Sequence, residues 1–212
     1  GVLDNRNRPY SRASIHNWFV GRALDVLRPG GLVCFITSSY FLDENDAGMR
    51  AHVASEADLI TAFRLPAGTF ERLASTSVQA DLVVLRKRAP GQAAAAAEWL
   101  DLDYVPKAML RSGCHEQYLR INRWFVQHPE HVLGRIDRVS NGYQAVPTAM
   151  PEGDLEAALL NAQTRVPKGI YGARPTAPSK EPRNVVSAPA GARPGSFVVH
   201  DGRIGIVEGD HI

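Results

Sequence analysis

The fold class is decided by one stretch of sequence, LRPGGLVCFITSS at residues 27–39. Its Pro-Gly-Gly at residues 29–31 predicts the end of a helix, because proline cannot continue the hydrogen-bond ladder and glycine adopts the left-handed conformation found at helix ends. The apolar run 32–36 follows at once, and such a run is typical of a strand covered on both faces, as in a parallel sheet. Helix, tight stop and buried strand together predict an α/β unit.

Helices are predicted on both sides of this strand. From Ser14 onward, apolar residues recur at three- and four-residue steps, which indicates a helix with one apolar stripe that we expect to be buried. The stripe consists of Ile15, Phe19, Ala23, Val26 and Leu27. Beyond the strand, Asp43 is placed to cap a second helix that runs to about Ser55.

Two further strands are predicted at residues 59–65 and 78–85. The first stops at the Pro-Ala-Gly of residues 66–68, and the second is closed by the basic tripeptide 86–88, which we interpret as a solvent-exposed strand end. A short strand is expected within residues 99–104 and a helix within 116–127. A second short apolar helical stripe, Leu155, Ala158, Leu159 and Ala162, follows an acidic turn.

The later part of the chain is read from its composition. An alanine-rich stretch indicates a connector, a stretch rich in proline, alanine, serine and arginine indicates a linker, and Asp201-Gly202 predicts the tight turn of a β-hairpin. The expected parts are 1–88, an α/β portion; 89–110, a connector; 111–166, a helical linker region; 167–195, a Pro/Ala-rich linker; and 196–212, a β-hairpin that begins a following domain.

Composition bounds the functional class. The chain has 212 residues, of which 44% are hydrophobic and 22% charged, values typical of a globular protein, and its net charge of +2 gives no strong overall field. Cys34 and Cys114 cannot build a disulfide framework, so a reducing, cytoplasmic setting is expected. No apolar run approaches the ~18–20 residues of a membrane span, so no membrane partner is expected. A start at Gly1 without methionine indicates a fragment of a longer protein.

Common catalytic and metal motifs are absent. The sequence has no Gly-x-Gly-x-x-Gly, no phosphate-binding Gly-x4-Gly-Lys-Ser/Thr, no Gly-x-Ser-x-Gly and no His-Glu-x-x-His. His128 and His131 are three residues apart, but Pro129 lies between them and zinc requires three or four ligands, so we interpret them as surface or capping histidines. The same applies to Cys114-His115. No metal site is expected.

Two features remain as candidate ligand contacts. The hydroxyls of Thr37, Ser38 and Ser39 follow the strand at its carboxyl end, where open α/β sheets bind ligands, although hydroxyls also end strands for local hydrogen-bonding reasons. Phe70 lies in a loop and either stacks on a base or closes the core over the sheet edge. The residues alone leave both alternatives open.

The order of segments in the first ninety residues resembles the carboxyl half of an N6-adenine DNA methyltransferase. The similarity is to type I-like amino-methylases, above all to the large methylase–helicase (SNF2-like) fusions of phages, plasmids and defence islands. A later stretch, residues 122–134, resembles the segment that joins methylase to helicase in those fusions. The matching pieces are LRPGG, LVCFITSSYFL, Met49-Arg50, LIxxxRLP, Thr69-Phe70 and STSV.

This resemblance implies a partial Rossmann-like class I methyltransferase sheet, followed by a small helical segment and a β-hairpin. It implies S-adenosyl-L-methionine as cofactor, DNA as partner and a helicase domain in the same bacterial or phage-encoded polypeptide. The loop that holds the cofactor and the Asn/Asp-Pro-Pro-Phe/Tyr motif that holds the target amine are not in this chain, so no catalytic residue is assigned. Target-base or cleft contacts fall to Ser38, Ser39, Phe70 and Thr76, and DNA-backbone contacts to Arg6, Arg8 and Arg12.

Two other functions stay open. A degenerate methylase fold could serve as a non-catalytic DNA-docking module of a helicase, with the basic tripeptide 86–88 and the arginine-rich start binding phosphates. A methylase that acts on RNA or protein is also compatible, because the fold does not fix the substrate. In either version a half-sheet exposes one apolar edge, so the isolated chain is expected to aggregate readily.

Overall fold

A computed structural model describes residues 8–71, 78–114, 118–140, 145–170, 187–200 and 203–207. The chain divides into two compact units, Gly1–Gly172 and Ala173–Ile212, which are considered one at a time. Within the described ranges, every helix is too short or too polar to cross a membrane.

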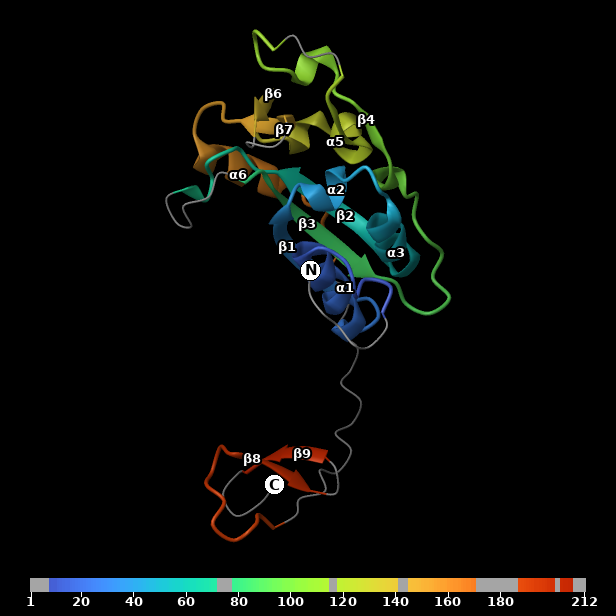
Figure 1. Cartoon of the computed structure of the whole chain (residues 1–212), viewed down its shortest axis with the longest axis vertical. Helices are drawn as coiled ribbons and strands as arrows, with labels where there is room; N and C mark the ends of the chain where they lie inside the picture. The colour runs from blue at the N-terminus through green and yellow to red at the C-terminus, as the bar shows by residue number, and fades with distance from the viewer. Residues whose placement is uncertain are drawn as a thin grey trace. The chain divides into compact units, whose positions relative to one another are not determined.

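The larger unit is built on a three-stranded sheet in which both strand pairings are antiparallel (Figure 1). Its strands are β1 (Leu32–Ser38), β2 (Ala57–Arg64) and β3 (Ala80–Lys87), in the order β1-β3-β2. β3 is antiparallel to both neighbours, so β1 and β2 run parallel to each other with β3 between them. All three strands were predicted close to these bounds, and the α/β class is confirmed.

The prediction that β1 is covered on both faces is wrong. Among the described strands β1 pairs with β3 alone, and Cys34 and Ile36 on one of its faces are exposed, Ile36 by 59%. Val33 and Phe35 on the opposite face pack against the main core. Among the described strands β1 is therefore an edge strand, and one of its faces is open and apolar.

The first helix forms where expected, but its buried face is a different one. α1 (Ile15–Val26) buries Val20, Gly21 and Leu24, whereas Ile15, Phe19 and Val26 of the predicted stripe are 60%, 54% and 68% exposed. Gly21 permits this packing, because a Cβ there would lie 2.4 Å from the ring of Tyr10. Ile15, Phe19 and Val26 of the predicted apolar stripe are thus solvent-exposed in the larger unit.

The predicted helix from Asp43 to about Ser55 begins later in the structure, and a separate short helix precedes it. α2 (Tyr40–Asp43) ends at the expected cap residue, and α3 (Gly48–Glu56) begins after a break in which Gly48 N–H donates to Asp46 Oδ1 at 2.8 Å. Asp43 does not cap a helix because its carboxylate is engaged by a buried arginine, described below.

The prediction of a helical region over residues 111–166 is wrong in part. Two antiparallel pairs lie in or reach this region: β4 (Leu102–Tyr104) with β5 (Arg120–Asn122), and β6 (Arg135–Ser140) with β7 (Ala145–Met150). Burial alternates along β6, the period of a strand with one covered face. The helices are α5 (Arg123–Gln127) and α6 (Leu155–Thr164), and the short 3-10 turns are η1 (Glu98–Leu100), η2 (Lys107–Met109) and η3 (Pro129–His131).

One hydrophobic core joins the early and late parts of this unit. Val83 and Leu85 of the sheet belong to the same buried cluster as Trp99, Ile121 and Phe125. A second, smaller cluster lies on the other face of the sheet, where α6 contributes Ala162 beside Phe63 and Leu65. The late segments therefore complete the fold of the sheet on both faces.

The smaller unit contains the predicted hairpin. β8 (Phe197–His200) pairs antiparallel with β9 (Arg203–Ile206), which confirms the hairpin, while its turn residues 201–202 lie outside the described residues. Most of the predicted linker, residues 171–186, also lies outside them.

Candidate functional site

The carboxyl ends of β1 and β2 lie at the same end of the sheet, on either side of β3, because the two strands run in the same direction. Open α/β sheets bind ligands beyond the carboxyl ends of their strands. Ser38 and Ser39 lie here. The Ser38 hydroxyl is 3.4 Å from the Tyr40 amide, and the Ser39 amide donates to Gln79 O at 3.0 Å. The preceding Thr37 buries a hydroxyl that has no hydrogen-bond partner among the described residues. The predicted hydroxyl cluster thus lies at the expected edge.

A buried ion cluster stabilises this edge. Arg64, the last residue of β2, donates from Nε and from its second terminal nitrogen to both oxygens of Asp81, each at 2.9 Å. Its remaining terminal nitrogen lies 2.8 Å from Asp43 Oδ2. Arg64 and Asp81 are both fully buried, and the guanidinium lies 4.5 Å from the centre of the Phe125 ring.

Burial and charge oppose each other in this cluster. Burial raises the pKa of Asp81 to about 6, although Arg64 pulls it in the opposite direction. Burial also acts to lower the pKa of Arg64, but Asp43 and Asp81 together raise it above its ordinary value. The guanidinium therefore stays charged, and Asp43 and Asp81 are its two countercharges.

Asn122 connects the ion cluster to the late segments. Its side-chain amide donates to Leu42 O and Trp99 O, both at 2.8 Å, and its oxygen accepts from the Trp124 amide at 3.0 Å, which caps α5. The backbone N–H of Asn122 donates to Asp43 Oδ1 at 2.8 Å. Asn122 and Arg64 thus bind opposite oxygens of one carboxylate.

Sequence reasoning did not identify these four residues as a site. Asp81 is the one usable signal, because an acidic residue inside the apolar run of β3 demands a partner when it is buried. Arg64 ends an apolar strand in the same way. Their pairing depends on the strand register Arg64↔Asp81, which the sequence does not display.

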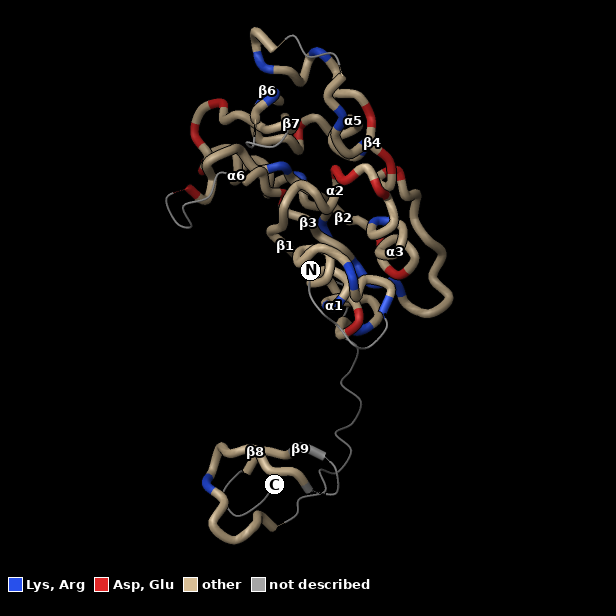
Figure 2. Tube along the Cα trace, viewed as in Figure 1, with Lys and Arg blue, Asp and Glu red and all other residues tan. Residues whose placement is uncertain are grey.

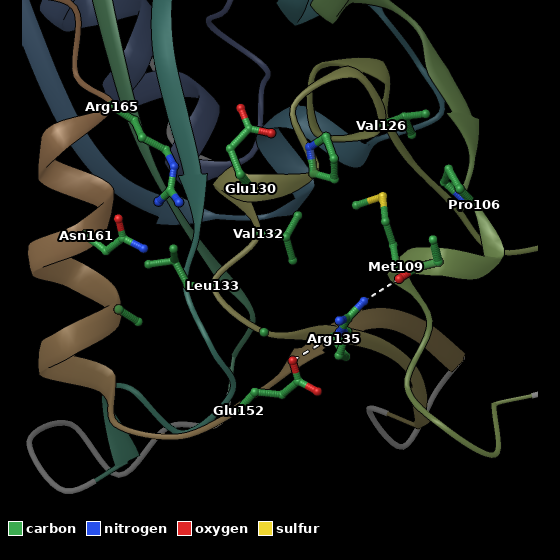
Figure 3. A pocket seen from close by; sticks show the side chains of 14 residues that line it. Pro106, Met109, Val126, Glu130, Val132, Leu133, Arg135, Glu152, Asn161 and Arg165 are labelled. Carbon is green, nitrogen blue, oxygen red and sulfur yellow. Dashed lines mark hydrogen bonds and ion pairs between the residues drawn. The ribbon is translucent and has the colours of Figure 1, made fainter.

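A pocket of about 530 Å³ lies next to the end of β2 (Figure 3). Its wall includes residues 132–134, and the Leu133 amide donates to Arg64 O at 2.9 Å. The apolar part of the lining includes Met109, Val126 and Val132. Figure 3 shows Asn161 of α6 and Arg165, which directly follows α6, on one side, and Arg135 bound to Glu152 at 3.0 Å on another. The pocket is of the size that binds small molecules.

The other predicted contact residues are dispersed. Phe70 is half-buried and packs against the second core cluster, so its ring closes the core there. Thr76 and Arg6 lie outside the described residues. Arg8 forms an ion pair with Asp25 and a hydrogen bond to Tyr10 at 2.6 Å, whereas Arg12 is exposed.

The interpretation of residues 86–88 as a solvent-exposed strand end is wrong for two of them. Arg88 lies 2.6 Å from Asp58, and its side chain is 10% exposed. The Lys87 ammonium donates to Leu24 O at 2.6 Å. Figure 2 shows basic positions near α1 together with acidic ones, and further acidic positions around α2 and β4. The described residues therefore give little support to a continuous basic surface at this end.

The two histidines of residues 128–131 differ from each other. His128 is 38% exposed, as predicted, but His131 is buried, so the surface interpretation is wrong for it. Burial lowers the pKa of His131, which keeps the imidazole neutral near pH 7. Glu130 lies between them, with its Oε1 3.7 Å from His128 Nδ1 and 3.6 Å from His131 Nε2.

Comparison with known proteins adds a partial similarity. No family model matches the chain, and no solved structure matches it. The chain is similar to "Defense against restriction protein B" of Escherichia phage P1, with 34% identity over 85 residues. The match covers 39% of this chain and 4% of the phage protein, so the chain corresponds to a small part of that relative.

Proposed function

We propose that this chain forms the later strands of an N6-adenine DNA methyltransferase domain, within a bacterial or phage-encoded methylase–helicase polypeptide of the cytoplasm. The proposal rests on the resemblance of the ordered segments in the first ninety residues. The structural observation that supports it best is the pair of parallel strands, β1 and β2, joined through α2 and α3.

The sheet is compatible with the back portion of a larger open α/β sheet. Sheets of that kind commonly carry an antiparallel strand among parallel ones, as β3 is here. Among described strands the outer edge of β1 pairs with nothing, and apolar Cys34 and Ile36 are exposed on one face of the strand. Further strands could therefore extend the sheet on the β1 side.

The residues of this chain would supply one wall of the reaction cleft. When bound, S-adenosyl-L-methionine supplies the methyl group that the adenine N6 amine attacks. The Ser38 and Ser39 hydroxyls lie at the carboxyl end of β1, where they could hydrogen-bond a base or cofactor edge. The ion cluster of Arg64 would fix the cleft wall, since alignment of amine, methyl and sulfur tolerates little displacement.

The similarity to the phage protein supports the biological setting of the proposal. That protein's name describes defence against restriction, and restriction acts on DNA. We therefore infer a link between this chain and phage anti-restriction.

The test uses the whole polypeptide that contains this chain. Its affinity for S-adenosyl-L-methionine is measured by calorimetry with and without duplex DNA, and methyl transfer is measured with tritium-labelled cofactor followed by detection of N6-methyladenine. Cofactor binding together with N6-methyladenine formation is the expected result. A protein that binds DNA but never the cofactor would establish the docking alternative instead.

Single substitutions then test the residues that we propose to line the reaction cleft. Ser38→Ala and Ser39→Ala are expected to lower the methylation rate ~10-fold or more while cofactor affinity is retained, because each removes a hydroxyl at the carboxyl end of β1. Ser55→Ala is the matched control, since the Ser55 hydroxyl donates to His52 O on an exposed surface.

A further inference from the structure

We propose that His128, Glu130 and His131 form a binding site for a divalent transition-metal ion of the zinc class. The three residues lie in and just before η3, which follows α5 and runs beside the end of β2. One ligand atom from each lies within 4.8 Å of the others. The inference is independent of the methyltransferase proposal.

The ring of His131 is held in the orientation that a metal ligand needs. Its Nδ1 is 2.9 Å from Ala62 O. A carbonyl oxygen can only accept, so Nδ1 carries the proton and Nε2 offers a lone pair. The ring also stacks on Phe63, with centroids 4.5 Å apart and planes at 10°. A ligating histidine commonly donates its second N–H to a backbone carbonyl in this way.

The other two ligand atoms face that lone pair. Glu130 Oε1 lies 3.6 Å from His131 Nε2 and 3.7 Å from His128 Nδ1. Zinc bonds to nitrogen and oxygen are about 2.0–2.2 Å, so tetrahedral ligands stand roughly 3.3–3.5 Å apart. The Glu130 oxygen therefore needs to approach each nitrogen by only a few tenths of an ångström, whereas the two nitrogens, which lie within 4.8 Å of each other, need to approach by up to about 1.5 Å.

The charged groups around His131 are Glu130 and the guanidinium of Arg165, whose positive charge acts to lower the pKa of His131. Among the described residues, the basic groups within 4.0 Å of the Glu130 carboxylate are the two imidazoles. The His128 ring also packs against Trp124, with centroids 4.2 Å apart and planes tilted by 39°. Two imidazoles and a carboxylate match the donor set that zinc prefers, with a fourth position left for water.

Titration of the EDTA-treated 212-residue chain with Zn²⁺ and Co²⁺ tests the site. Calorimetry is expected to give one ion per chain, bound at micromolar concentration or more tightly. The Co²⁺ complex is expected to show the visible absorption of a tetrahedral site. Co²⁺ should also quench the fluorescence of Trp124, and Trp124→Phe should remove that part of the quenching.

Variants at exposed positions keep the test independent of folding. His128→Ala and Glu130→Gln are each expected to weaken Zn²⁺ binding by at least ~10-fold. His52→Ala, at a histidine outside the site, is expected to bind as the unaltered chain does. Binding that is absent, is lost equally in His52→Ala, or is unchanged in both site variants would overturn the proposal.

Discussion

Arg64 donates two hydrogen bonds of 2.9 Å to the two carboxylate oxygens of Asp81, and neither side chain is accessible to solvent. The pair joins the end of β2 to the start of β3. It is extended by Asp43 and, through that carboxylate, by Asn122. These contacts form a buried polar network that joins α2, β2, β3 and β5.

Replacement of Asp81 by asparagine is expected to destabilise the chain by about 3–5 kcal/mol, because a buried guanidinium loses one of its two countercharges. The free energy of unfolding in urea measures the effect. Glu152→Gln, which removes the exposed partner of Arg135, is the matched control and should cost less than about 1 kcal/mol. Equal losses in the two variants would contradict the role of burial.

Replacement of Asn122 by alanine is expected to cost about 2–4 kcal/mol. The change leaves Leu42 O and Trp99 O without their donor and removes the cap of α5. Asp154→Ala removes the cap of α6 at an exposed position and should cost about 1 kcal/mol. The difference between the two unfolding energies isolates the contribution of the buried contacts.

Gly134 is expected to tolerate no side chain. A Cβ at this position would lie 2.2 Å from the backbone oxygen of Met150, so Gly134→Ala should separate β6 from β7 and cost about 3 kcal/mol or more. Gly153→Ala has a positive φ of 77° but no atom within 4 Å of the new Cβ, and about 1–2 kcal/mol is expected. Thermal unfolding compares the two variants directly, and a tolerated Gly134→Ala would show that the hairpin can shift.

The reactivity of the Cys34 thiol probes the solvent accessibility of the open face of β1. It is exposed, and desolvation raises its pKa above the ordinary 9.0. Because the thiolate is the reactive form, its alkylation by iodoacetamide is expected to be slow at pH 7.5 and to keep accelerating above pH 9.0. Mass spectrometry measures the modification, with Cys114 as the internal reference and Cys34→Ser as the control.

The same probe tests whether the sheet continues beyond β1. In the whole polypeptide, an extended α/β sheet would have a covering layer on the open face of β1, so alkylation of Cys34 on that face is expected to be at least ~10-fold slower than in the isolated chain. Equal rates at Cys34 in both proteins would contradict extension of the sheet on this side. The reference rate at Cys114 separates this result from a general change in reactivity.

The strands of the sheet were predictable because their apolar runs are local signals bounded by proline and glycine. The face of α1 was not, because Ile15, Phe19 and Val26 form a proper apolar stripe and yet the opposite face packs on the sheet. Periodicity identifies an amphipathic helix but does not say which neighbour is present. The prediction of burial failed for that reason.

The candidate site was predictable in its location and much less so in its parts. Ser38 and Ser39 lie at the expected strand end because chain order alone places them there. The Arg64 cluster needs strand register, and the burial of His131 needs the docking of residues 129–133 beside β2, a contact between segments about seventy residues apart. Such long-range contacts leave no spacing pattern in the sequence.

Residues between Tyr40 and Phe125, from both sides of the alanine-rich connector, together enclose the buried charges of Arg64 and Asp43. A protein cut after Arg88, at the end of the predicted α/β portion, would keep Arg64 and Asp43 but lose the Phe125 ring and the Asn122 amide that shield them. Excision of the sheet by itself is therefore expected to yield a molten product, whereas a protease that nicks the exposed alanines at 93–96 should leave the two pieces associated.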